Sequence, residues 1–312
     1  MKTLLSAIAI TSLLATGACS HAASTPDGLA KALQSALDSG DFDAAGKLAD
    51  IDHAPAQLHF FYLDNVLTCS SRAKCTVSAA PATDELREQL KKQAAQLHAQ
   101  APSVDGMITI AVKPKDSSGS GSGTIKMPYA KVGNDYEIVS IHYSPAQFAA
   151  LRAKSNETLV QEFFAAGIPD MDASEPRTDW ATAATPLPAD GGDAGKAFVA
   201  QTRAMSAAVD AKDPDAAMHS GGGMAEIVFR DKDAGGKAIP LIDRQRNLHV
   251  QSLRMLRDVK VNGGYLLGES AVLLIEAHDG IGWFVRGPIL LSHRRGTWGR
   301  AGDNTVSYPA GT

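Results

Sequence analysis

The chain has 312 residues, a formal net charge of −4, 44% hydrophobic residues and 21% charged residues. This composition is that of an ordinary globular protein, and the weakly acidic balance argues against a dedicated nucleic-acid binder, which needs a surplus of basic residues. The length allows two domains of normal size.

The first segment of the chain has the three parts of a secretory signal. Lys2 supplies a positive charge, an apolar run extends over Leu4–Ala15, and small residues follow over Thr16–Ala23. The apolar run is too short to span a bilayer, because a membrane helix needs about 20 apolar residues. We therefore expect export to the periplasm, with residues 1–22 removed as the signal peptide.

A second interpretation of the same segment places the cleavage earlier. Residues 13–18 before Cys19 resemble a lipobox, although Thr16 stands where such boxes usually carry leucine. Cleavage there removes residues 1–18 and makes Cys19 the lipid-carrying first residue, so that the lipid anchors the protein to the outer membrane. The sequence leaves both alternatives open. A lipid on Cys19, in the second alternative, is the only membrane contact expected.

Two cysteines remain after the signal is removed or lipidated, Cys69 and Cys75. In an oxidising compartment a single remaining pair favours a disulfide, and closing so short a loop contributes about 2 kcal/mol. A metal site is less favoured, because the spacing is not Cys-x-x-Cys and no further thiol or imidazole lies nearby.

The first half of the mature chain, residues 23–144, is expected to form an α+β domain. A leucine every fourth residue over Leu29–Leu37 predicts the first helix, and Asp41 caps a second one. A strand is expected over Leu58–Thr68, followed by a helix that begins at Thr83. Three strands complete the domain, marked by Ile108, Ile110 and Val112, by Ile125, Met127 and Tyr129, and, after a turn at Gly133-Asn134-Asp135, by Val139, Ile141 and Tyr143.

Residues 145–194 connect the two halves. Ser144-Pro145-Ala146-Gln147 is a capping box that opens bridging helices over residues 145–167, which we expect to pack on the first half. Residues 168–194 contain four prolines and a Gly-Gly pair, a composition typical of a linker. Trp180 interrupts this stretch, and we expect it to dock on a neighbouring domain.

The second half, residues 195–312, repeats the order of the first. The phrase Asp38–Ala45 recurs as Asp210–Ala217, with five of eight positions identical at a constant offset of 172. Its aspartates are expected to cap helices rather than bind calcium, because the phrase lacks the further oxygen ligands and final glutamate of an EF-hand. We then expect a strand over Met224–Arg230, a helix marked by Leu241, Leu248 and Leu256, and strands over Ser270–Ala277, Trp283–His293 and Trp298–Tyr308, with a turn at Gly296.

The order helix, helix, strand, helix and three strands, together with Gly40–Ala45, resembles the nuclear transport factor two-like superfamily. The resemblance covers nearly all of the mature chain as two copies. It implies two similar α+β domains, each with helices packed on a curved antiparallel sheet that forms a cone, often with a cavity at its open end. A single larger α+β domain, whose halves look alike by chance, is the alternative.

The motifs that carry chemistry in other proteins are incomplete here. The run Gly119–Gly123 leads into a strand and lacks the lysine and helix of a P-loop, so we expect a hairpin tip. His219–Gly223 has no matching Gly-x-Ser-x-Gly and is expected to be a loop. The histidines are scattered, at His53, His59, His142, His249, His278 and His293 among others. We therefore assign no catalytic, cofactor-binding or metal-binding residue.

The arginines of the second half allow two interpretations. Spread around a helix and along strands, they form an ordinary solvated surface, which is the favoured interpretation. Gathered on one face, they form a positive surface for an acidic partner or lipid headgroups. The residues are Arg244, Arg246, Arg254, Arg257, Arg286, Arg294, Arg295 and Arg300.

The function expected is that of a non-catalytic binding or interaction protein of the bacterial envelope, which holds an unknown protein, peptide or small ligand. One version is an inhibitor or immunity-type lipoprotein. The alternative is a cone-fold enzyme of the isomerase or cyclase type acting on a small apolar substrate, which needs an acid–base pair facing an apolar cavity. Two ionisable side chains within hydrogen-bond reach in a closed pocket favour the enzyme, and unconnected polar groups favour binding.

Overall fold

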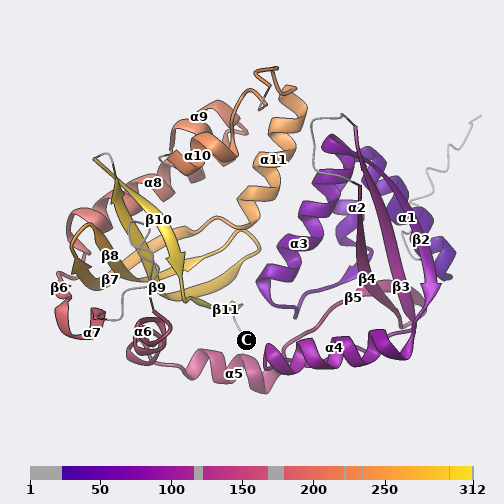
Figure 1. Cartoon of the computed structure of the whole chain (residues 1–312), viewed down its shortest axis with the longest axis horizontal. Coiled ribbons are helices and arrows are strands. Elements are labelled where there is room, and N and C mark those ends of the chain that lie inside the picture. The colour runs from indigo at the N-terminus through magenta and orange to yellow at the C-terminus, as the bar shows by residue number, and fades with distance from the viewer. Residues whose placement is uncertain are drawn as a thin grey trace, which may run out of the picture.

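The protein contains two sheets, each covered by helices, and is therefore an α+β protein, as the sequence predicts (Figure 1). The computed structural model describes residues 23–115, 122–167, 179–220, 223–233, 235–294 and 296–310. The expected leader, Cys19 and most of the glycine run after residue 115 lie outside the described residues. Within the described part, every helix is too short or too polar to cross a lipid bilayer.

The first half builds a five-stranded sheet in the order β1-β5-β4-β3-β2, antiparallel except for the parallel pair β1 and β5. Its elements are α1 (Pro26–Ser39), α2 (Phe42–Gly46), β1 (Ala49–Asp50), α3 (Ala56–Leu67), a single π turn (Thr68–Arg72), β2 (Ala73–Pro81), α4 (Asp84–Gln96), β3 (Gly106–Pro114), β4 (Gly123–Val132) and β5 (Asp135–Val139).

The core of the first half lies between helices α1 to α3 and one face of this sheet. Leu29, Leu33 and Leu37 of α1 are almost completely buried, in one cluster with Ile108 and Ile110 of β3. A spacing of four residues places the three leucines on the same helix face, as predicted. Each buried leucine contributes about 1.5–3 kcal/mol, so this face holds α1 against the sheet.

The second half builds an antiparallel sheet in the order β10-β9-β8-β7-β6, and β11 continues along β9. Its elements are α7 (Trp180–Ala183), β6 (Thr185–Leu187), α8 (Gly192–Asp210), α9 (Pro214–Ser220), α10 (Gly223–Val228), α11 (Leu241–Leu253), β7 (Arg257–Leu267), β8 (Ser270–His278), β9 (Trp283–Arg294), β10 (Thr297–Asp303) and β11 (Val306–Pro309). Phe198 of α8 is buried with Leu273 and Ile289 in its core.

The repeated phrase forms the same helix–turn–helix in both halves. The left-handed residue after the first helix is Gly40 (φ 66°) in one copy and Lys212 (φ 53°) in the other. The next residue, Asp41 or Asp213, donates its N–H to the carbonyl five residues earlier, at 3.0 Å and 2.9 Å. Each aspartate also accepts the N–H three residues later, at 2.9 Å and 3.0 Å. The predicted helix caps are confirmed in both copies.

A glutamine covers an edge strand of each sheet. Gln34 of α1 donates to Cys75 O at 3.1 Å and accepts from Val77 N at 2.9 Å, so it pairs two backbone groups on the free edge of β2. Gln201 of α8 donates to Trp298 O of β10 at 2.6 Å. Unpaired backbone N–H and C=O groups on an edge strand can pair with a strand of another chain. The two glutamines bind some of these groups and so leave fewer of them available.

Two segments expected as strands are helices. The run Leu58–Thr68 lies mostly in α3, and Met224–Arg230 lies mostly in α10. A short run rich in apolar residues does not distinguish a strand from a buried helix by periodicity. The residues that the fold buries are four apart, Tyr62 and Val66 in α3 and Ala225 and Phe229 around α10, which is the spacing of a helix.

The strand predictions are correct for β3, β4, β8 and β9, and the run over residues 298–308 divides into β10 and β11. The turn at Gly133 is a two-residue hairpin, and it starts β5 at Asp135, so the expected strand at Val139–Tyr143 lies four residues too late. β2 and β7 were missed. The inward side of β2 carries small or weakly apolar residues, and β7 is interrupted by two register shifts.

The bridging helices are α5 (Pro145–Ala153) and α6 (Asn156–Ala165), and the predicted capping box at Ser144 is present. The expectation that both pack on the first half is wrong. Phe148 of α5 lies 5.4 Å from Tyr143 and 5.7 Å from Trp283, between ring centroids, and so contacts both halves. α6 packs on β9, where Arg286 donates to Asn156 Oδ1 at 3.1 Å.

The expected linker is also wrong from Asp179 onward. β6 pairs with β7, so residues 185–187 belong to the second sheet, and α8 begins before residue 195. Residues 168–178 lie outside the described part of the chain. Trp180 is 2% exposed, stacks on Phe164 with ring centroids 5.7 Å apart, and is buried with Val272 and Leu290, which confirms its predicted docking.

Helices α3 and α11 form the seam between the halves (Figure 1). Arg254, just after α11, pairs with Asp64 of α3. Arg246 Nη2 donates to Ser39 O at 3.1 Å. Polar contacts of this kind are typical of interfaces between units that have their own cores.

Candidate functional site

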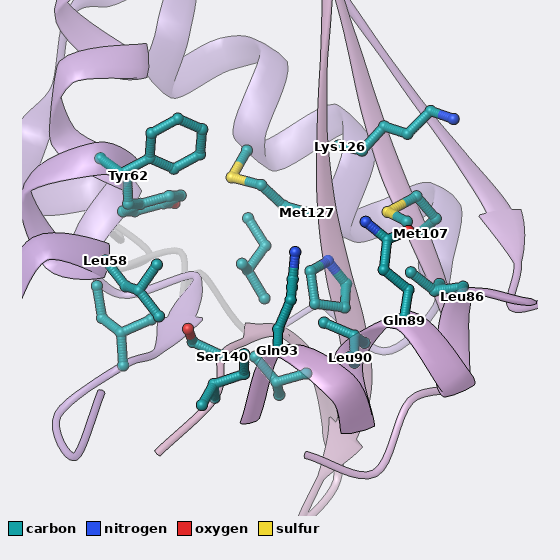
Figure 2. Close-up of a pocket in the computed structure, with 16 residues that line it drawn as sticks. Leu58, Tyr62, Leu86, Gln89, Leu90, Gln93, Met107, Lys126, Met127 and Ser140 are labelled. Atoms are coloured by element: carbon teal, nitrogen blue, oxygen red, sulfur yellow. The ribbon is translucent and has the colours of Figure 1, made fainter. Parts of the chain in front are cut away.

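A cavity of about 340 Å³ opens in the first half between α3, α4 and strands β3 to β5 (Figure 2). This volume is at the lower end of the range of small-molecule sites. The cavity is lined by Ile51, Leu58, Phe61, Tyr62, Leu86, Gln89, Leu90, Gln93, Met107, Lys126, Met127, Pro128, Ile138, Val139, Ser140 and Ile141.

Helix α4 supplies one wall of the cavity. Its N-cap is Thr83, whose side chain accepts the N–H of Leu86, as the sequence predicts. Leu90 and Ala94 are its only buried residues, and most of the other side chains are exposed. A helix that buries so narrow an apolar stripe leaves space beside it, and this space is part of the cavity.

Helix α3 supplies the opposite wall. Its Tyr62 is 3% exposed and donates its hydroxyl proton to Ala45 O at 2.6 Å. The neighbouring Phe61 lines the cavity and is 50% exposed, which is unusual for a phenylalanine. One turn of α3 therefore anchors the helix with one ring and presents another ring to the opening.

The polar groups of the cavity do not form an acid–base pair. Burial raises the pKa of the Tyr62 phenol above its ordinary value, so the phenol stays protonated at neutral pH. Its hydroxyl donates a hydrogen bond to Ala45 O. The other polar lining residues are Gln89, Gln93, Ser140 and Lys126. No carboxylate and no imidazole is among the 16 lining residues.

A second groove, of about 290 Å³, lies in the second half between α8 and the start of β7. It is polar, and its charges are matched within the protein. Arg257 Nη1 lies 3.1 Å from Asp210 Oδ1, and Arg203 and Asp258 add one charge of each sign. Because these charges balance, the groove offers a ligand no net electrostatic attraction.

His59 is a buried ionisable group at the seam. It is 8% exposed and packs edge-on against Trp283, with ring centroids 5.6 Å apart. Its Nε2 has no hydrogen-bond partner among the described residues. Desolvation lowers the pKa of the imidazole, and the charge of Asp52 acts in the opposite direction. The ring is therefore neutral at pH 7 and serves packing.

The predicted disulfide joins Cys69 to Cys75, whose Cα atoms are 5.4 Å apart. It closes the π turn between α3 and β2 and lies in the core cluster of the first half. Cys19 lies outside the described residues, so its lipidation stays a prediction. Among the described residues, no group of three or more His, Cys, Asp or Glu side chains is placed to hold a metal ion.

The arginines of the second half do not gather into one positive surface. Most of them bind partners inside the protein, which supports the interpretation as ordinary structural and surface residues. The pairs are Arg244 with Asp215 at 2.7 Å, Arg246 with Asp243 at 3.4 Å, Arg254 with Asp64, Arg257 with Asp210 at 3.1 Å, and Arg300 with Asp303 at 2.5 Å. Arg295 lies outside the described residues.

Sequence reasoning missed the cavity, because none of its residues carries an unusual motif. The sequence predicts Met127 only as a strand residue and α4 only as a helix that begins at Thr83. The one local signal was the aromatic run Phe60-Phe61-Tyr62, which was read as part of a strand. The chain matches no family model, no curated protein and no solved structure.

Proposed function

We propose that the protein is a non-catalytic binding protein that holds a small apolar ligand in the cavity of its first half. The observation that carries the proposal is an open cavity whose walls are aliphatic side chains, methionines and a half-exposed Phe61. A phenylalanine left in water is unfavourable, and a ligand that covers it gains free energy in proportion to the apolar area removed from solvent.

The absence of an acid–base pair in the lining favours binding over catalysis. An isomerase or cyclase has to move a proton between a base and its substrate, and this needs an ionisable group with a suitable pKa beside the reacting atom. Here the only buried ionisable group of the lining is Tyr62, whose hydroxyl already donates a hydrogen bond to Ala45 O.

Two methionines make the cavity adaptable. Met107 and Met127 lie on neighbouring strands and both line the cavity. Methionine is unbranched and polarizable, so it adjusts to ligands of different shape. This supports a site for a class of apolar molecules rather than for one rigid ligand.

We also propose that the protein works in the bacterial envelope and that its halves are tandem cone-like domains. The leader pattern and the disulfide support the location. The shared helix–turn–helix and the two mainly antiparallel sheets support the duplication. The cavity then belongs to one copy only.

The binding proposal is tested with 1-decanol in titration calorimetry. The wild-type protein is expected to bind it, and Ser140→Phe, which fills part of the cavity, is expected to weaken binding at least tenfold, or about 1.4 kcal/mol. Ser78→Phe on the exposed face of β2 is the matched control and should bind like the wild type. Equal binding by both variants would place the ligand elsewhere and refute the proposal.

A further inference from the structure

One cation lies at the rim of the cavity. Lys126 of β4 is the only charged residue among the 16 that line the cavity, and its side chain is exposed. Within the described part of the chain, its ammonium group makes no ion pair and no hydrogen bond. On α4, Lys91 pairs with Glu88 at 2.7 Å and Arg87 pairs with Asp84 at 3.0 Å.

The cavity is mainly apolar, and its one charged group lies on the side away from α3. Figure 2 shows Tyr62 and Leu58 on one side, Lys126 and Gln89 on the other, and Met127 between them. α3 contributes apolar side chains and the buried Tyr62, whereas α4 and β4 contribute apolar side chains such as Leu90 together with Gln89 and Lys126. A ligand that matches this arrangement is apolar over most of its length and carries one polar group at its end.

We infer that the ligand is a single-chain amphiphile with an anionic head group, the chain lying among the apolar side chains of α4, β3 and β4 and the head beside Lys126. This inference rests on the proposed binding function and specifies its ligand class. The volume of about 340 Å³ suits one short chain and not a two-chain lipid. The unpaired ammonium favours a carboxylate or a phosphate over a neutral or cationic head.

The expected contribution of the charge is modest, because Lys126 is solvated. An exposed ion pair is worth about 0.2–1 kcal/mol, which corresponds to an affinity gain of up to about fivefold. This gain in affinity should shrink as the salt concentration rises from about 0.05 to about 0.5 M, because the Debye screening length then falls from roughly 14 to roughly 4 Å. The apolar contribution does not depend on screening, so the two are separable.

The test compares decanoate, decyl phosphate, 1-decanol and decyltrimethylammonium on the full protein by titration calorimetry at low salt. Decanoate and decyl phosphate are expected to bind about three- to fivefold more tightly than decanol, and the ammonium amphiphile most weakly. Lys126→Gln should remove the advantage of the anions without changing decanol binding. Lys131→Gln, at an exposed position on the same strand, is the matched control and should keep the advantage.

Two results would overturn the inference in different ways. If decanol and the anions bind equally well and Lys126→Gln changes neither, the head-group assignment is wrong while the binding function stands. If none of the four amphiphiles binds, both the assignment and the proposed function fail. A preference for decanoate over decyl phosphate or the reverse identifies which anionic head the site takes.

Discussion

The two halves of the molecule share a framework and differ in several elements, among them one insertion between strands. Each begins with the helix–turn–helix of the repeated phrase, and each continues with a four-stranded antiparallel meander, β2 to β5 or β7 to β10. In the second half, a two-residue turn containing Gly268 joins β7 to β8 directly. In the first half, α4 stands between β2 and β3, and the apolar cavity lies beside it. The candidate function is therefore where the halves diverge.

The halves are also stabilised by different means. The aspartates of the repeated phrase are paired with arginines in the second half, Asp210 with Arg257 and Asp215 with Arg244. Among the described residues, Asp38 of the first half accepts only from Gln34 of its own helix. The first half has the disulfide instead, next to the end of α3. The same phrase thus caps helices in both halves, and its outer carboxylates have different partners in each.

Reducing the disulfide is expected to have the largest effect and to act on the first half. Opening a loop of this length lowers the free energy of unfolding by about 2 kcal/mol. All three tryptophans, Trp180, Trp283 and Trp298, lie in the second half, so their fluorescence reports that half, whereas far-ultraviolet circular dichroism reports both. In urea, dithiothreitol should move the dichroism transition to lower denaturant and leave the fluorescence transition nearly in place.

The control is the double variant Cys69→Ala and Cys75→Ala, which should not respond to dithiothreitol. If reduction moves both transitions equally in the wild type, the halves unfold as one cooperative unit. The contrast between two separately stabilised halves would then be wrong, and the polar seam would have to couple them more strongly than its contacts suggest.

The turn of the repeated phrase predicts substitutions of opposite sign in the two halves. Gly40→Ala should lower the free energy of unfolding by about 1–2 kcal/mol, because its φ is 66° and a Cβ there would lie 3.0 Å from Ser70 Cβ. Lys212 already occupies the same left-handed conformation with a side chain. Lys212→Gly should raise the free energy of unfolding by about 0.5 kcal/mol. The relief of backbone strain in the folded state exceeds the cost of the greater conformational entropy that glycine gives the unfolded chain.

Urea unfolding of both variants checks this prediction. Gly46→Ala is a control for the general effect of removing a glycine, because a Cβ there meets no atom within 4 Å. If Lys212→Gly lowers the free energy of unfolding instead, the lysine side chain stabilises the fold by more than its strained backbone conformation destabilises it. The two turns would then be alike in backbone only.

The α+β class and the recurring helix caps could be predicted from the sequence because they depend on local patterns. Leucines four apart, aspartate caps and the Gly133 turn each act within a few residues, and each appears in the structure as expected. Leu58–Thr68 was predicted wrongly because its aromatic residues favour a strand locally, while burial of every fourth residue against α1 and the sheet makes it a helix. Tertiary packing decided the outcome, and packing is not visible in one sequence.

The cavity could not be predicted because it depends on the placement of α4 across the sheet. Leu90 and Met107 are far apart in the chain and look like ordinary core residues. The disulfide was predictable for the opposite reason, since Cys69 and Cys75 are close in sequence and are the only pair left after the leader. The predicted leader and Cys19 lie outside the described residues, so they stay predictions.

The smallest expected effect is on the pH dependence of stability, and it tests the seam between the halves. Burial lowers the pKa of His59 below its unfolded value of 6.5, and Asp52 partly offsets this shift. The unfolded chain therefore takes up a proton at a higher pH than the folded one. The stability that the neutral ring provides is complete above about pH 6.5 and declines as the pH falls below that value. Unfolding free energies at pH 7.5 and 5.5 measure this decline.

His59→Phe keeps a ring against Trp283 and removes the proton, so this variant should lose less stability than the wild type between pH 7.5 and 5.5. His219→Phe, at an exposed position of α9, should behave like the wild type. Because Trp283 belongs to the second half and His59 to the first, protonation should also separate the halves. The tryptophan fluorescence, to which Trp283 contributes, should then change before the dichroism signal does. Identical pH dependence in wild type and His59→Phe would mean that the seam remains closed on acidification and that other groups govern acid stability.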